Sequence, residues 1–433
     1  MSSFKIILIS ITIFATIFSC NSYKTNEKIT NVEDYNTYLQ PSIEKLTTAK
    51  ADLNFWQTKL KNQPTQYVLL SKLAAAQTTL FSLTGNVNYL VEAGKSLETL
   101  NEKSPGNNAG YLRAYANNCI SQHQFKKALA ALKLAEEEGS NLNATHKMLF
   151  DTHLELGNNE KAEYYLANIK DKTQFDYRIR LSKWHDHNGD LKSAIDEMER
   201  AVKLAERSNL SDLKQWAYTN LADFYGHAGR IEDSYNNYLK ALELNPMNAY
   251  ALKGIAWITY SYERDTEEAN RILSGITEYH QSPDYHLLKA EIAEYDNNII
   301  VKDAHMLAYK NMIGNTQYGD MYNTYNIEIL TAKNENLEKA FQLALKEVEE
   351  RPTPQSYSLL AWTYYKKGEI NKALQVVEQN VANKTTEPAV QLVMANIYKA
   401  NGNKEQLLAL KDDLLGSSYE LGPLAEKEIA KIF

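Results

Sequence analysis

The sequence predicts an all-α solenoid, in which antiparallel helix pairs stack side by side along the chain. Glycine and proline, the residues that interrupt helices, number only 17 and 9 among 433 residues. No segment shows the alternation of apolar and polar residues that is typical of strands. Small residues recur at a spacing of about 34 residues, as in the series Ala222, Ala256 and Ala290. This recurrence predicts repeated helix pairs, because small side chains let two helices cross closely.

The clearest repeated unit runs from Gln215 to Pro246. Its apolar residues follow helical spacing on both sides of Gly229, which is expected to form the turn between two helices. This order of residues resembles the tetratricopeptide repeat family, and the resemblance extends over residues 109–415. It implies a right-handed superhelix with a concave groove and a function in binding. The turn glycine recurs along the chain as Gly157, Gly189, Gly229, Gly368 and Gly402.

The chain divides into five expected segments. Residues 1–19 are expected to be a signal peptide, and residues 20–36 a lipidated cysteine followed by a flexible tether. Residues 37–108 are expected to form an N-terminal helical cap with a degenerate repeat. The repeats themselves are expected at 109–415, and a capping helix at 416–433. A solenoid needs such a helix because its last repeat must be covered by an element with a polar outer face.

The N-terminus predicts export and attachment to lipid. Residues Ile6 to Phe18 form an apolar run that is shorter than the roughly 20 residues of a membrane span. The end of this run, from Ile17 to Cys20, resembles a bacterial lipobox, which implies acylation of the Cys20 thiol and cleavage just before it. An ordinary secretory signal with an incidental cysteine is the alternative. No acidic cluster follows Cys20, and this favours a bacterial outer-membrane protein that faces the periplasm.

Several functional classes are disfavoured by composition and motifs. A formal net charge of −7 argues against nucleic-acid binding, which requires a basic face. No catalytic or nucleotide-binding motif is present, so the sequence predicts neither an enzyme nor a cofactor. His185 and His187 would point about 200° apart on a helix, which makes a shared metal ion unfavourable. Cys119 falls at a core position and is expected to be a small buried residue rather than a reactive thiol.

The resemblance also implies which residues face a ligand. In this family, four positions of each first helix line the concave groove. In this chain the candidates at those positions are Trp216, Asp223, Tyr250, Lys253, Trp257, Tyr260, Trp362 and Tyr365. Aromatic rings in a groove suit a peptide, a helix or the face of a sugar. Packing of the tryptophans between neighbouring helices is the alternative, because tryptophan serves as core filler as well as interface anchor.

The sequence therefore favours a non-catalytic, lipid-anchored scaffold of the bacterial cell envelope. Its expected partners are a protein or peptide in the groove and the membrane through the N-terminal lipid. The alternative is a nutrient-capture lipoprotein that resembles the SusD class and binds a glycan or peptide beside a transporter. The scaffold is favoured because that class carries large insertions, whereas most of this chain is repeat.

Overall fold

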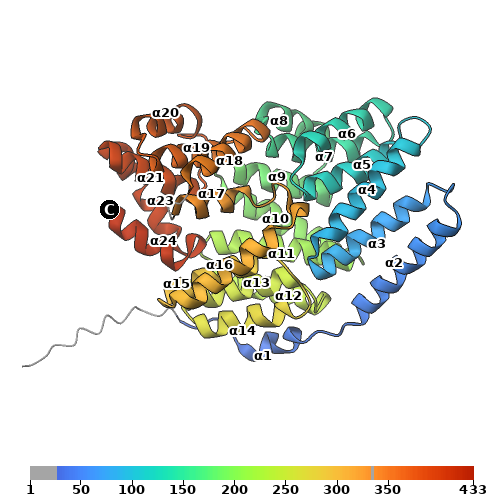
Figure 1. Cartoon of the computed structure of the whole chain (residues 1–433), viewed down its shortest axis with the longest axis horizontal. Helices are drawn as coiled ribbons and strands as arrows, with labels where there is room; N and C mark the ends of the chain where they lie inside the picture. Colours follow the sequence, from blue (N-terminus) through green and yellow to red (C-terminus); the bar gives the residue numbers. More distant parts are fainter. Residues whose placement is uncertain (1–26, 333–335) are drawn as a thin grey trace, which may run out of the picture.

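The computed structural model describes residues 27–332 and 336–433; the expected signal peptide and Cys20 lie outside the described residues. Within those two ranges the chain is helical and contains no strand. The helices stack in antiparallel pairs that wind around a common axis (Figure 1). The prediction of an all-α solenoid is thereby confirmed.

The N-terminal helices precede the region expected to hold the repeats. They are α1 (Val32–Tyr35), the 3₁₀ turn η1 (Asn36–Leu39), α2 (Glu44–Asn62), α3 (Leu69–Thr84) and α4 (Val87–Lys103). Helix α3 packs on both α2 and α4. The segment with α1 and η1 instead lies against α12 and α14, far along the sequence.

The next six pairs follow one another along the superhelix. They are α5 (Ala109–Ser121) with α6 (Phe125–Glu138), α7 (Leu142–Glu155) with α8 (Asn159–Asn168), α9 (Phe175–His187) with α10 (Leu191–Glu206), α11 (Ser211–His227) with α12 (Ile231–Leu244), α13 (Ala249–Trp257) with α14 (Thr266–Thr277), and α15 (Pro283–Tyr295) with α16 (Ile299–Ile313). Helix α13 continues into a π-helical turn, η2 (Ile258–Tyr262).

The C-terminal part begins with the short 3₁₀ turn η3 (Thr316–Tyr318). It continues with α17 (Asn323–Ala332) paired with α18 (Leu337–Glu350), α19 (Pro354–Lys366) with α20 (Ile370–Asn380), and α21 (Pro388–Asn401) with α22 (Lys404–Ala409). The chain ends with α23 (Lys411–Gly416) and α24 (Ser418–Ile432). Ile429 and Ile432 of α24 are buried against α21, as a capping helix requires.

Residues with positive φ make the turns inside the pairs. Gly229 has a φ of +71° between α11 and α12, a conformation that glycine adopts without a steric penalty. The pair at α15 and α16 has no glycine at this place. There Asn297 takes a φ of +59°, which asparagine tolerates better than most residues. The pair of α15 and α16 therefore has the same kind of turn, although its sequence lacks the glycine that indicates one.

Small residues occupy the helix crossings, as their spacing predicts. Ala222, Ala241 and Ala256 are each 0% exposed. A Cβ atom built on Gly254 would lie 2.3 Å from the ring of Tyr238, so α12 and α13 could not approach so closely with a larger residue there. Cys119 is also buried, and burial raises the pKa of its thiol to about 11. It is a small packed residue, as expected.

Successive turns of the superhelix touch each other. The guanidinium of Arg351 donates to a carboxylate oxygen of Glu155 over 2.8 Å, and these residues are 196 positions apart. In an earlier part of the chain, the backbone N–H of Gln281 donates to the carbonyl oxygen of Thr84 over 2.8 Å. The winding is tight enough to bring Thr84 next to Gln281, and Glu155 next to Arg351.

None of the helices in residues 27–332 and 336–433 combines the length and the apolar character needed to cross a bilayer.

Candidate functional site

Helix α24 covers the groove at Trp257. The indole N–H of Trp257 donates to the carbonyl oxygen of Tyr419 over 3.2 Å, and the hydroxyl of Ser261 donates to the same oxygen over 2.6 Å. Gly422 lies so close that an added Cβ would come within 2.9 Å of the indole ring. Trp257 was a candidate to face a ligand, with packing between helices as the alternative. The structure instead places it, half-buried, under the chain's own C-terminal helix.

Tyr260 lies inside the core. It is 0% exposed, and its hydroxyl donates to a carboxylate oxygen of Glu291 over 3.1 Å. Burial also raises the pKa of Glu291 to about 7. The π-helical turn η2 rotates Tyr260 away from the direction that a regular helix would give it. A ligand in the groove could not reach this side chain, contrary to its expected place.

Asp223, Tyr250 and Lys253 come together on the inner side of α11 and α13. The hydroxyl of Tyr250 donates to Asp223 over 2.7 Å, and the hydroxyl of the buried Tyr238 donates to its other oxygen over 2.6 Å. Burial raises the pKa of Asp223, although these two hydrogen bonds act in the opposite direction. Lys253 pairs with Asp284 of the next first helix at 3.3 Å. Tyr250 remains 57% exposed, so its ring is available to a ligand.

Trp362 and Tyr365 form a separate stack on α19. Their ring centroids are 5.1 Å apart, and the indole N–H of Trp362 donates to the hydroxyl of Thr331 over 3.1 Å. The ammonium of Lys366 lies 4.5 Å from the Trp362 ring. Helix α19 packs on α17, α18, α20 and α21, so this half-buried stack belongs to a later part of the superhelix than Trp216 and Tyr250.

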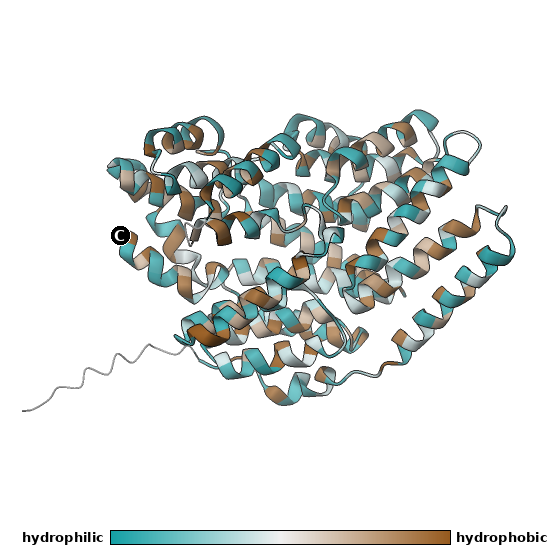
Figure 2. Ribbon diagram, viewed as in Figure 1, coloured by the Kyte–Doolittle hydropathy of each residue, from teal (hydrophilic) through white to brown (hydrophobic). Residues whose placement is uncertain are grey.

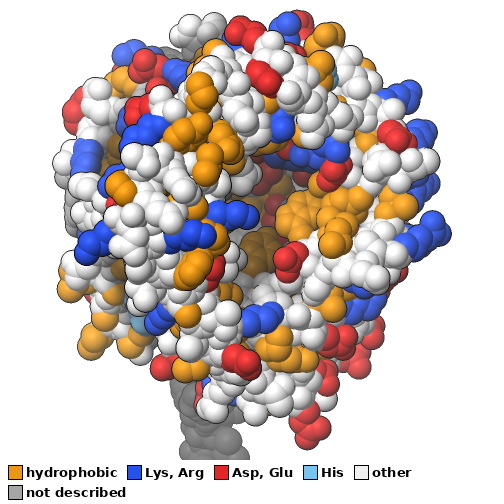
Figure 3. All heavy atoms as spheres, turned by 90° about the vertical axis from the view of Figure 1, so that its right-hand side faces the viewer, with side chains coloured by type: hydrophobic (Ala, Val, Ile, Leu, Met, Phe, Trp, Pro, Cys, Tyr) orange, Lys and Arg blue, Asp and Glu red, His pale blue; other side chains and the backbone are white. Residues whose placement is uncertain are grey.

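A large open cleft of 1280 Å³ lies between α2 and α3 on one wall and α11 with the start of α13 on the other. Trp216 and Tyr250 line it, and Trp216 is 43% exposed. The Trp216 ring packs edge-on against Phe175 at a centroid distance of 6.0 Å, which fixes its orientation. The face of the molecule that carries α2 and α3 is hollowed (Figure 3). We call this feature the α2–α11 cleft.

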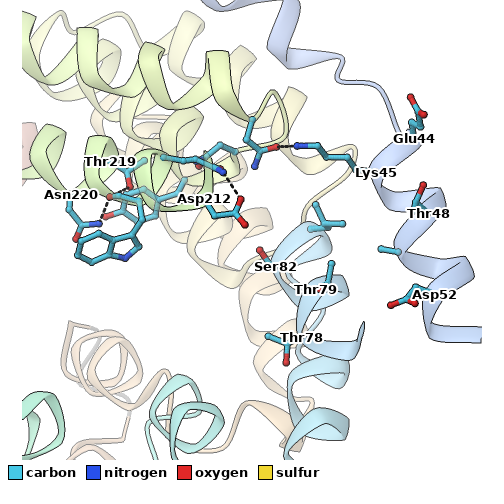
Figure 4. Close-up of a pocket in the computed structure, with 17 residues that line it drawn as sticks. Glu44, Lys45, Thr48, Asp52, Thr78, Thr79, Ser82, Asp212, Thr219 and Asn220 are labelled. Atoms are coloured by element: carbon cyan, nitrogen blue, oxygen red, sulfur yellow. Dashed lines mark hydrogen bonds between the residues drawn. The ribbon is translucent and has the colours of Figure 1, made fainter. Parts of the chain in front are cut away.

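Polar side chains dominate the rest of the α2–α11 cleft. Threonine, serine, asparagine and glutamine side chains from both walls point toward the space between them (Figure 4). Lys45 of α2 donates to the side-chain oxygen of Asn245 over 3.2 Å and thereby connects the two walls. The carboxylates of Glu44, Asp52 and Asp212 outnumber the single cationic lining residue, Lys45. The lining of the cleft therefore carries a net negative charge and includes the aromatic rings of Trp216 and Tyr250.

The repeat register predicts one wall of the cleft and not the other. Trp216 and Tyr250 follow from the repeat register. The lining residues of α2 and α3, such as Thr48, Asp52 and Ser82, lie in the region expected to form a cap and a degenerate repeat. The polar residues of α3 recur at helical spacing, which is a signal for a solvent-facing stripe. Nothing in that spacing indicates that the stripe faces α11.

Among the residues that the structure describes, no group of three or more histidine, cysteine, aspartate or glutamate side chains is arranged to hold a metal ion. His185 lies 3.9 Å from Asp190, and His187 contacts Asn159 at 3.1 Å. The two rings therefore contact different partners.

Comparison with known proteins supports the repeat. Residues 217–248 match the model of the tetratricopeptide repeat. This match covers α12, most of α11 and the turn between them. A search of the curated proteins finds no match.

Solved structures with a similar course of the chain include several helical repeat proteins. Human IFIT1 with m7Gppp-AAAA is 14% identical, with 75% of each chain covered and a TM-score of 0.47. A tetratricopeptide repeat protein from Parabacteroides merdae is also 14% identical, over 57% of this chain and 93% of that one, with a TM-score of 0.38. Yeast Tom70 is 14% identical over 89% and 86% of the chains, with a TM-score of 0.39. None of these likenesses indicates what this chain binds. With its stacked helix pairs, the chain is a helical repeat protein, and residues 217–248 match a tetratricopeptide repeat.

Proposed function

We propose that this protein is a non-catalytic scaffold, anchored by lipid in the bacterial cell envelope, that binds an extended segment of a partner protein in the α2–α11 cleft. The observation that carries the proposal is the exposure of Trp216 and Tyr250 inside a cleft of 1280 Å³. Exposed aromatic rings in a concave site are typical anchors of protein interfaces. At Trp257, by contrast, the chain's own C-terminal helix already occupies the inner face.

The lining chemistry supports a peptide as the ligand. Amide and hydroxyl side chains offer both donors and acceptors, which match the N–H and C=O groups of an extended backbone. The Trp216 ring offers an apolar surface for one side chain of the partner. The excess of carboxylates at Glu44, Asp52 and Asp212 favours a segment with lysine or arginine.

The lipid anchor rests on the lipobox that ends at Cys20. The test is metabolic labelling with a clickable fatty acid in cells that express the full chain. We expect the wild-type protein to take up the label and Cys20→Ala to take up none. A wild-type protein without label would contradict the anchor and the envelope assignment.

Peptide binding is tested by panning a random peptide library against the purified protein. We expect enrichment of basic peptides with an apolar or aromatic residue, and a loss of their affinity of about 2 kcal/mol in Trp216→Ala. Tyr164→Ala is the matched control, because Tyr164 is an aromatic residue of α8 that is 57% exposed outside the cleft. Asp52→Lys should lower the affinity of the same basic peptides, because it replaces a negative charge in the cleft by a positive one.

The alternative, nutrient capture, is tested by an array of oligosaccharides. Stacking of a sugar ring on Trp216 or Tyr250 among hydroxyl and amide groups would suit a glycan as well. Binding of glycans that depends on Trp216, without enrichment of any peptide, would contradict the scaffold and favour this alternative.

A further inference from the structure

The first turns of α16 expose apolar side chains. Ile300 is 85% exposed, and Ile299 and Leu307 are 56% and 60% exposed. Ile300, Ala304 and Leu307 follow one another at helical spacing, so they form one outward stripe. We call this stripe, together with Ile299 and Val301, the α16 tip. The beginning of α16, toward the lower left of the molecule, is brown in Figure 2.

The two second helices that directly precede α16 expose polar residues at their outward faces. Helix α12 exposes Glu232, Asn236 and Lys240, and α14 exposes Glu267 and Arg271. The apolar character of the α16 tip is therefore not a general property of the repeat. A contiguous exposed apolar surface marks a contact with another molecule or with a membrane.

The first described residues of the chain are held at the turn between η2 and α14, one helix pair before α16. The backbone N–H groups of Ile29 and Thr30 donate to one oxygen of Glu263 over 2.7 and 2.6 Å. Glu263 lies at the turn of one helix pair, and residues 296–298 form the turn of the next pair, directly before α16. Because stacked helices lie about 8–10 Å apart, the two turns are neighbours.

The length of the chain limits how far the membrane can be from this place. Lys28 pairs with Asp265 at 3.2 Å, which holds it to the same turn. Eight residues lead from Cys20 to Lys28 and span at most about 28 Å when fully extended. An acyl group on Cys20 would therefore keep the lipid surface within about 28 Å of Lys28, which lies one helix pair before the α16 tip.

We propose that the α16 tip contacts the lipid surface of the membrane that holds the acylated Cys20. This inference rests on the proposed lipid anchor. The apolar side chains would enter the boundary between head groups and acyl chains, as at the apolar face of an interfacial helix. The lipid-anchored segment before Lys28 raises the effective concentration of the α16 tip at the membrane surface, so a small apolar contact is sufficient to keep the tip bound there. The net charge of −7 gives no general attraction to anionic lipids, which leaves apolar burial as the driving force.

The test measures the depth of residue 300 in vesicles. Ile300→Cys is introduced into the full chain, purified with its acyl groups, labelled with bimane, and reconstituted in equimolar phosphatidylethanolamine and phosphatidylglycerol. Cys119 is buried with a pKa of about 11, so it stays unlabelled. Leu408→Cys is the matched control, because Leu408 is an apolar residue of α22 that is 63% exposed.

Addition of doxyl-labelled phosphatidylcholine should reduce the emission of the label at 300 about twofold or more and leave the label at 408 unchanged. Equal emission at both positions, in protein that carries fatty acid, would overturn the contact and leave the anchor intact. Protein without fatty acid would overturn both. A dimer in detergent that Ile300→Asp dissociates would assign the tip to a second copy of the chain and also overturn the proposal.

Discussion

Trp216 and Trp257 lie on neighbouring first helices and differ in what covers them. The ring of Trp216 is 43% exposed in the α2–α11 cleft. The ring of Trp257 is hydrogen-bonded to the backbone of Tyr419 and packed against Gly422. The same residue type therefore serves as a free aromatic surface in one repeat and as internal packing in the next.

Alanine substitutions should separate the two roles. Trp257→Ala would leave a cavity under α24 and remove a hydrogen bond, so we expect a loss of about 3 kcal/mol in the free energy of unfolding. Trp216→Ala removes little packing, and we expect a change of at most about 1 kcal/mol. Urea unfolding followed by circular dichroism measures both. Equal losses would show that Trp216 is also internal packing.

Glu291 should make stability depend on pH. Burial raises its pKa from an ordinary value of 4.5 to about 7 in the folded protein. The favourable contribution of its protonated form is complete below pH 4.5 and is lost as the pH rises through 7. We expect wild type to lose about 2 kcal/mol relative to Glu291→Gln over this interval. Glutamine keeps an acceptor for the hydroxyl of Tyr260. Parallel stability curves for the two proteins would contradict the raised pKa.

At the scale of elements, α24 fills the part of the groove next to Trp257. It packs on α11, α15, α21 and η2, and Arg264 in the turn after η2 pairs with Glu426 of α24 at 2.5 Å. Gly422 interrupts the helix with a φ of +86° and lets its backbone approach Trp257. The docking of α24 therefore depends on a conformation that other residues adopt poorly.

Gly422→Ala tests this dependence. The added Cβ would lie 2.9 Å from both Trp257 and Glu291 in a backbone conformation unfavourable to alanine, so we expect a loss of about 2 kcal/mol. Hydrogen exchange should increase first in α24 and η2. Gly416→Ala is the control, because nothing lies within 4 Å of the added Cβ and its φ is not positive. Identical exchange in both variants would exclude a special role for Gly422.

At the scale of the whole molecule, contacts between successive turns connect distant repeats. Arg351 donates to Glu155, its guanidinium lies 4.8 Å from the centroid of the Phe125 ring, and Gly157 leaves room for the backbone of Pro352. In an open solenoid each repeat contacts its neighbours alone. Here the winding adds contacts between repeats that are far apart in sequence.

Arg351→Ala should therefore weaken two distant places together. We expect a loss of about 1–2 kcal/mol, since Glu155 keeps Lys183 as a partner at 3.0 Å. Hydrogen exchange should increase both at the turn after α7 and at the loop before α19. Lys192→Ala is the control, because its ion pair with Asp196 is exposed and within one helix. An increase confined to α18 and α19 would contradict coupling between the turns.

Local features of the fold could be predicted from the sequence, because they depend on residues within one repeat. The spacing of Ala222 and Ala256 indicated the helix crossings, and Gly229 indicated a turn. The register also placed Trp216 and Tyr250 on an inner face. It could not predict that the turn η2 is π-helical, which places Tyr260 in the core.

The assembly of the cleft was decided by tertiary structure. Each helix pair is rotated slightly relative to the one before, and the rotations add up over many pairs. A small difference in the rotation of each pair decides whether α2 lies opposite α11 or far from it. The summed rotation cannot be predicted from any local sequence pattern. The same winding brings Tyr419 onto Trp257 and closes the groove there. The sequence thus determined the repeating helix pairs, whereas the sum of their rotations decided which inner surface stays open.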